Sequence, residues 1–132
     1  MHILKNEIDT MAFAEFIAES STIGNCYALH GDLGVGKSTF VRYVIKHFDP
    51  TIDNIPSPTF SIVQYYGSCK VLHADCYRLE KADDIYNIDL LELIPSCISF
   101  IEWPEVIQEL LPSNTKHIYF AYCDQGRVAK LV

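Results

Sequence analysis

The sequence predicts an α/β layered fold whose mixed, mainly parallel sheet carries inserted hairpins. Apolar runs of strand length alternate along the chain with segments whose apolar residues recur at helical spacing. A glycine-rich loop joins one such run to one such helix, and two other pairs of runs are separated by only a few turn-forming residues. With 132 residues, of which 49% are hydrophobic, the chain has the size of one domain, residues 1–132, with a substantial core.

The first half of the chain is predicted to begin with an amphipathic helix that takes Asp9 or Thr10 as its N-cap. A strand over residues 25–29 then leads into the glycine-rich loop. The helix that follows the loop ends near Asp49, because Pro50 cannot continue it.

Turn residues divide the second half of the chain. Gly67-Ser68 and Asp124-Gln125-Gly126 are typical of hairpin turns, and Pro95 is predicted to end a helical segment. The predicted elements are a loop over 51–59, strands over 60–66 and 70–73, a broken helix over 82–94, a strand over 97–101, a short helix over 105–111, and strands over 116–122 and 127–131.

The glycine-rich loop has the spacing G-x-x-x-x-G-K-[ST] of a phosphate-binding loop. Its glycines let backbone N–H groups turn toward a phosphate, since a Cβ would obstruct the close approach. Lys37 is expected to place a positive charge at a solvent-facing phosphate site, and the hydroxyl of Ser38 is suited to bind Mg²⁺. The flanking strand and helix make a plain glycine-rich turn the poorer interpretation. The predicted nucleotide contacts, in a P-loop NTPase-like fold, are Gly31, Asp32, Leu33, Gly34, Val35, Gly36, Lys37, Ser38 and Thr39.

Two carboxylates stand at the ends of predicted strands, where sheets of this kind bind their ligands. Asp75 follows an apolar run, and Glu102 follows the run over 97–101. Either could instead be structural, Asp75 as an N-cap or as the partner of Arg78, and Glu102 as the cap of the helix that follows it. Beside a phosphate loop we favour Mg²⁺ binding or water activation for both.

Two neighbours of these carboxylates keep two interpretations each. Trp103, the only tryptophan of the chain, is either a core residue or a contact of the nucleotide. His73 is either a satisfied structural residue of a half-buried strand or a residue that helps to order Asp75.

The composition restricts the function. The formal net charge is −7 and there are three arginines, whereas a protein that held RNA or DNA alone would need a basic surface. Any nucleic acid is therefore expected to be held by another subunit, and the acidic surface either faces a basic partner or maintains solubility.

The five cysteines form no C-x-x-C pair, which favours reduced thiols over a metal cluster. No stretch is apolar enough for a signal peptide or a membrane span, so a cytoplasmic protein is predicted.

Four motifs follow one another along the chain: GDLGVGKS at 31–38, SPTF at 57–60, HADCYRL at 73–79 and IEWP at 101–104. In this order they resemble the TsaE family, also called YjeE, far more specifically than the loop alone. The segments before Leu29 and after Leu111 carry little of the resemblance. Departures are slight: Ser38 stands where many members have threonine, and Cys76 replaces a commoner leucine.

The resemblance implies a small bacterial ATPase that is needed to make threonylcarbamoyladenosine in tRNAs reading codons that begin with adenine. It implies that Thr59 belongs to a switch-like loop that senses the γ-phosphate or Mg²⁺, that Asp75 belongs to a second switch, and that Glu102 and Trp103 lie in the active site. The expected catalytic residues are therefore Thr59, Asp75 and Glu102, and the expected Mg²⁺ ligands are Ser38, Asp75 and Glu102. The implied partners are the TsaD and TsaB proteins, with TsaC supplying threonylcarbamoyl-adenylate and tRNA bound only through the complex.

Without the resemblance, the residues also permit a small-molecule kinase, a regulatory GTPase or a nucleotide-dependent interaction module. A kinase usually needs an acceptor pocket and a lid with arginines, for which the chain has neither the length nor the arginines. A GTPase typically reads guanine with the aspartate of Asn/Thr-Lys-x-Asp, and the nearest match, Thr115-Lys116-His117-Ile118, lacks it. ATP is therefore the expected nucleotide, and its turnover would exclude the interaction module.

Overall fold

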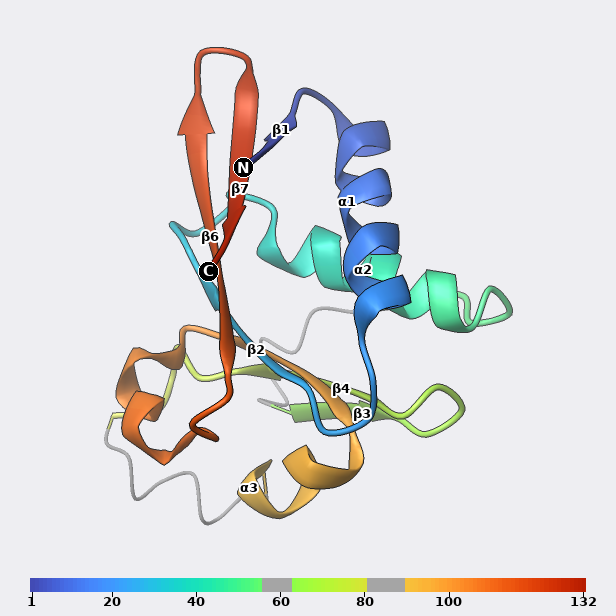
Figure 1. The fold of residues 1–132 in the computed structure, drawn as a ribbon, viewed down its shortest axis with the longest axis vertical. Coiled ribbons are helices and arrows are strands. Elements are labelled where there is room, and N and C mark those ends of the chain that lie inside the picture. The colour runs from blue at the N-terminus through green and yellow to red at the C-terminus, as the bar shows by residue number, and fades with distance from the viewer. Residues whose placement is uncertain (56–62, 81–89) are drawn as a thin grey trace.

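A computed structural model describes residues 1–55, 63–80 and 90–132, and it confirms the predicted α/β fold (Figure 1). None of the helices in these ranges combines the length and the apolar character needed to cross a lipid bilayer. The elements are β1 (His2–Leu4), α1 (Glu7–Ser20), β2 (Cys26–His30), α2 (Lys37–Phe48), β3 (Val63–Tyr66), β4 (Val71–Asp75), α3 (Leu90–Leu93), β5 (Ile98–Glu102), β6 (Lys116–Cys123) and β7 (Gly126–Leu131). Short 3₁₀ turns η2 (Ile94–Ser96), η3 (Pro104–Val106) and η4 (Gln108–Leu110) flank β5.

The strands form one seven-stranded sheet in the order β1-β7-β6-β2-β5-β4-β3. The four strands β6, β2, β5 and β4 are parallel to one another, and antiparallel pairs β1–β7, β7–β6 and β3–β4 complete both edges. Because β1 is antiparallel to β7, it runs in the same direction as the central four. The sheet is thus mixed and mainly parallel, with hairpins at its edges, as the sequence predicts.

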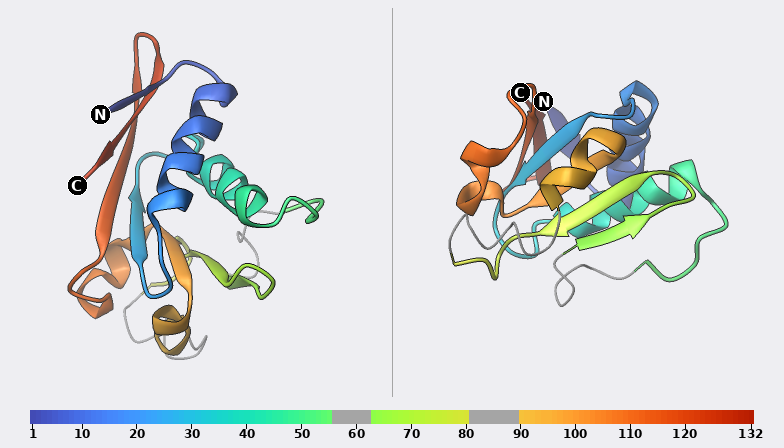
Figure 2. Two further views of the ribbon diagram at one scale, coloured as in Figure 1. Left: turned by 45° about the vertical axis from the view of Figure 1, so that its right-hand side comes forward. Right: turned by 90° about the horizontal axis from the view of Figure 1, so that it is seen from below.

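The sheet is covered on both faces (Figure 2). Helices α1 and α2 lie on one face, where Phe13 and Phe40 pack with Phe100 and Phe120 of the strands. On the other face, Leu90 of α3, Ile94 of η2 and Ile107 between η3 and η4 belong to a second apolar cluster, which contains Leu72 and Ile101 of the strands. Since the strands β2, β4 and β5 are buried on both faces, the carboxyl edge of the parallel strands is left as the place for a ligand.

The beginning of the chain differs from the prediction in two respects. The N-cap of α1 is Asn6 and not Asp9 or Thr10: Asn6 Oδ1 accepts a hydrogen bond from the Asp9 N–H at 3.0 Å. Asp9 in turn accepts one from the Lys5 N–H at 2.9 Å, which fixes the residue before the N-cap to the first turn. Strand β1 is not predicted, because its three residues form a strand only by pairing with β7 at the other end of the chain.

Several later boundaries also differ. The predicted helix over 105–111 is wrong: η3 and η4 are separate 3₁₀ turns in a segment too short for a stable α-helix. Pro95 does not end the helical segment but lies within η2, where its missing N–H has no helical partner to lose. Only Asp124 and Gln125 join β6 to β7, since Gly126 already pairs with Cys123. The loop over 51–59, the strand over 60–66 and the helix over 82–94 lie partly outside the described residues.

Candidate functional site

The glycine-rich loop connects β2 to α2 at the carboxyl edge of the parallel strands. A cavity at this edge brings the loop together with the ends of β4 and β5. It is lined by Leu33, Gly34, Gly36, Lys37, Ser38, Thr39, Asp75, Glu102 and Trp103. Most of the residues that the sequence singles out therefore line one cavity, while Thr59 lies outside the described residues.

The backbone of the loop takes conformations that favour glycine. Gly31, Gly34 and Gly36 have φ angles of 143°, 81° and 110°. A Cβ on Gly31 would lie 2.6 Å from the carbonyl oxygen of Phe120, so the loop rests directly on β6. Gly36 is the N-cap of α2 and has no side chain that could compete with an anion at the positive end of this helix.

Lys37 is packed inside the site and is only 4% exposed. Its ammonium donates a hydrogen bond to the Gly31 carbonyl at 2.5 Å and lies 3.8 Å from the centre of the Trp103 ring. Lys37 thus lines the loop cavity although most of its side chain is buried. Burial lowers the pKa of Lys37, and the negative charges of Glu102, Glu105 and Asp75 oppose that shift.

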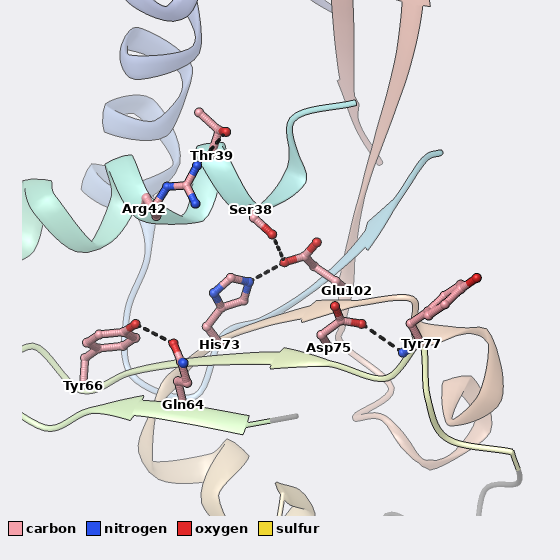
Figure 3. Close-up of polar contacts among 9 residues, drawn as sticks. All are labelled: Ser38, Thr39, Arg42, Gln64, Tyr66, His73, Asp75, Tyr77 and Glu102. Carbon is pink, nitrogen blue, oxygen red and sulfur yellow. Dashed lines mark hydrogen bonds and ion pairs between the residues drawn. The ribbon is translucent and has the colours of Figure 1, made fainter. Parts of the chain in front are cut away.

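Glu102 joins the loop to the sheet (Figure 3). Ser38 Oγ donates to Glu102 Oε2 at 2.7 Å, and His73 Nε2 lies 2.5 Å from the same oxygen. Glu102 is 3% exposed and is the last residue of β5, so its side chain meets the loop from the neighbouring strand and does not cap the next turn.

The environment of Glu102 favours its ionised form. Burial would raise the pKa of this carboxyl group, but the hydrogen bond and charge of His73, the hydrogen bond from Ser38 and the charge of Lys37 together lower it. Glu102 is therefore a carboxylate at neutral pH, able to accept hydrogen bonds or bind a cation.

Asp75 is the last residue of β4 and lies in register with Glu102. Its Oδ1 accepts a hydrogen bond from the Tyr77 N–H at 2.9 Å, which makes a local turn after the strand. Burial raises the pKa of Asp75, and the charge of Glu102 adds to this shift, while Tyr77, His73 and Lys37 oppose it. The two carboxylates thus lie on adjacent strands with opposite pKa shifts.

Trp103 has a strained backbone. Its φ and ψ are 52° and 57°, in the left-handed region that a bulky side chain rarely adopts, at a cost of about 1–3 kcal/mol. This conformation accompanies a half-buried indole that lines the cavity and carries the Lys37 ammonium on its face. Tyr77 packs beside it, with ring centres 5.0 Å apart. Trp103 therefore belongs to the site and not to the core.

Some neighbours of the loop carry no signal in the sequence. Arg127 Nη2 donates to the Gly34 carbonyl at 3.4 Å, across 93 positions of the chain. His30, directly before the loop, lies 3.6 Å from the Glu105 carboxylate and 2.9 Å from His117 Nδ1. These contacts depend on the pairing of distant segments, which no local spacing reveals.

Thr39, a predicted nucleotide contact, accepts a hydrogen bond from Arg42 at 3.0 Å.

Comparisons with known proteins agree on one family. The family model described as "Threonylcarbamoyl adenosine biosynthesis protein TsaE" matches residues 4–129. The tRNA threonylcarbamoyladenosine biosynthesis protein TsaE of Rickettsia bellii (strain RML369-C) is 40% identical over 127 residues, which cover 95% of this chain and 88% of that protein. The protein of the same name from Bacillus subtilis (strain 168) is 33% identical over 116 residues, covering 86% and 72%. The crystal structure of Bacillus subtilis YdiB is similar with a TM-score of 0.74 and 27% identity, over 94% of this chain and 78% of that one.

Proposed function

The chain belongs to the TsaE family of threonylcarbamoyl adenosine biosynthesis proteins, and from that premise we propose that it is an ATP-hydrolysing accessory subunit in the formation of threonylcarbamoyladenosine in tRNA. ATP and Mg²⁺ bind at the loop cavity. The subunit acts with TsaD and TsaB proteins, through which it meets the tRNA. Hydrolysis changes the state of the assembly, and the chemistry on the tRNA base takes place in another subunit.

The observation that carries this proposal is the 2.7 Å hydrogen bond from Ser38 Oγ to Glu102 Oε2. This bond brings the Ser38 hydroxyl, the group that a phosphate loop offers to Mg²⁺, into contact with a buried, ionised carboxylate. A hydroxyl has one proton and two lone pairs, so Ser38 can keep this bond while its oxygen binds a cation. Burying a carboxylate costs free energy, and a loop that only held phosphates would not need one here. The pair therefore supports hydrolysis over binding alone.

The residues of the loop fit a triphosphate. The positive φ angles of Gly31, Gly34 and Gly36 turn the backbone as a phosphate cradle requires. Lys37 has to leave the Gly31 carbonyl and the Trp103 face to reach a phosphate, which replaces one neutral acceptor with a charged one. Mg²⁺, when bound, neutralises charge on the phosphate oxygens. Among the described residues that line the cavity, Ser38, Glu102 and Asp75 would supply oxygen ligands to it.

Glu102 is suited to orient the attacking water. Its lowered pKa makes it a weak base, so its contribution is to accept a hydrogen bond and to fix a direction, and not to remove a proton completely. Ser38 and His73 both use Oε2, which leaves Oε1 as the oxygen that neither of them engages. Asp75 adds a second negative charge on the adjacent strand, where it supports the cation.

The accessory role rests on charge. The chain has a formal net charge of −7 and three arginines, so it is poorly suited to neutralise tRNA phosphates by itself. An acidic subunit can instead dock on a complex that holds the tRNA.

The test is a reconstituted tRNA-modification assay with TsaB, TsaD and tRNA, in which preformed threonylcarbamoyl-adenylate is supplied so that ATP is not needed to make it. Multiple-turnover modification is expected to require this protein and hydrolysable ATP. Modification that continues unchanged when the protein is omitted, or tight binding of tRNA by this protein alone at physiological salt, contradicts the accessory role.

Asp75→Asn is expected to weaken the Mg²⁺ dependence of ATP binding. The amide keeps an oxygen that can accept from the Tyr77 N–H but loses the negative charge. Loss of one carboxylate that supports a bound metal ion typically lowers the metal affinity about 10–100-fold. Calorimetric ATP titrations at several Mg²⁺ concentrations measure the effect, and titrations in EDTA provide the control, where the variant and the wild type should agree. Superimposable Mg²⁺ titrations would remove Asp75 from the metal site.

A further inference from the structure

We propose that His73 is a positioning residue for ATP hydrolysis: its Nε2–H holds the Glu102 carboxylate in the orientation that turnover needs. This inference rests on the proposed function, because it assigns His73 a part in the same reaction. His73 does not line the loop cavity and is 0% exposed, so it acts only through Glu102.

The sheet places His73 where it can reach Glu102 from the side. His73 lies on β4 in register with Phe100 of β5, two residues before the pair formed by Asp75 and Glu102. Val71 and Phe100 belong to the apolar cluster under α1 and α2, and strand alternation puts His73 on that same face. His73 is therefore enclosed beneath the start of α2, where Ser38 and His73 reach the same oxygen of Glu102 (Figure 3).

Within the described parts of the chain, only one ring nitrogen of His73 has a hydrogen-bond partner. An ionised carboxylate has no proton to give, so His73 Nε2 is the donor in the 2.5 Å contact with Glu102 Oε2. Nδ1 is buried and has no hydrogen-bond partner among the described residues. A buried polar atom without a partner costs free energy, so an apolar side chain would fill this space at lower cost. What a histidine provides at this position, and an apolar side chain would not, is the hydrogen bond to Glu102.

The bond has a directional consequence. Two donors, Ser38 Oγ and His73 Nε2, meet at Oε2 and fix the plane of the carboxylate. Without His73, the Ser38 hydroxyl is the remaining donor to this oxygen among the residues that the structure describes, so the carboxylate is held less firmly in its orientation. The phosphates are gripped by the loop, so losing His73 is expected to slow turnover and to leave nucleotide binding nearly unchanged.

Two amide substitutions separate the two ring nitrogens. The side-chain nitrogen of Gln is as many bonds from Cβ as His Nε2, whereas that of Asn corresponds to Nδ1. His73→Asn is expected to lower kcat about 10–100-fold, the usual effect of losing such a supporting hydrogen bond, with ATP Kd within about twofold of wild type. His73→Gln is expected to restore most of the lost activity. Turnover is measured with the TsaB and TsaD partners present, and Kd by calorimetry.

Further variants provide the controls. In a Glu102→Gln background, His73→Asn should change kcat less than about twofold, because the group that it positions is already altered. Ser99→Ala removes the other buried polar atom without a partner in the described structure, and should leave kcat unchanged. If His73→Asn fails to fold, His73→Leu takes its place with the same expected kcat.

The outcomes distinguish the two proposals. If the wild type shows no ATP hydrolysis that depends on Glu102, the proposed function is wrong and His73 has no reaction to support. If the wild type hydrolyses ATP and Glu102→Gln strongly slows it, equal kcat values for wild type and His73→Asn overturn the positioning role. Equal losses in the Asn and Gln variants, or additive losses with Glu102→Gln, overturn it as well.

Discussion

Glu102→Gln is expected to lower kcat for ATP hydrolysis at least about 100-fold, the lower range for a group that assists proton transfer, while ATP binding persists. The amide oxygen can still accept from Ser38 and His73 in place of Oε2, so the local fold is kept. Its NH₂ group then stands in place of Oε1 and presents protons where a carboxylate oxygen would accept them. The change therefore removes charge and acceptor capacity at the site with little change of shape.

Phosphate release at saturating ATP measures this effect, and calorimetry measures binding in the same preparation. Asp75→Asn is the matched comparison, since it alters a carboxylate at the corresponding position of the adjacent strand and is expected to act mainly through Mg²⁺. A Glu102→Gln variant that hydrolyses ATP at the wild-type rate would exclude Glu102 from the reaction.

Lys37→Met is expected to weaken ATP binding by about 100-fold without unfolding the protein. A hydrogen bond to a charged group contributes about 1.5–3 kcal/mol, and each 1.4 kcal/mol is a factor of ten in Kd, so one lost phosphate contact already accounts for most of this change. Met is preferable to Ala because Lys37 is buried against Trp103, and Met keeps an unbranched apolar side chain there.

Calorimetric titration with Mg²⁺-ATP and a thermal unfolding curve of each protein test this prediction together. Lys46→Met is a suitable control, because Lys46 lies on α2 as well but is partly exposed and pairs with Asp53 at 3.7 Å. An unchanged ATP Kd in a folded Lys37→Met protein would mean that the loop is not the nucleotide site.

The fold was largely predictable because its signals are local. The strand before the loop, the helix after it and the two hairpins each follow from a short run of residues, and the structure contains all of them. The juxtaposition of Asp75 with the loop was also predictable, because parallel strands bring their carboxyl ends to one edge. The catalytic and metal-binding roles of these residues remain predictions.

The features that the sequence did not predict depend on contacts between distant residues, or on the small difference between an α-helix and 3₁₀ turns in a short segment. Spacing cannot show that Lys37 rests on Trp103, because that contact depends on the left-handed turn at the end of β5. The chain from His73 through Glu102 to Ser38 joins three separate elements, so the sequence left His73 with two interpretations. The 3₁₀ turns after β5 carry a helical pattern but are too short for the α-helix that the pattern suggests.

The segments that contact the phosphate loop are synthesised after the loop itself. The ribosome makes β2 and the loop early, but both strands beside β2, β5 and β6, are synthesised much later. Gly31 rests on Phe120, and the Gly34 carbonyl meets an arginine 93 positions further along the chain. A nascent chain therefore has the sequence of the loop before it has its shape, and the long-range pairings that fix this shape form late. On the proposed function, nucleotide binding would therefore require a chain synthesised through β7, and a product of interrupted translation would carry the motif without the contacts that shape the loop.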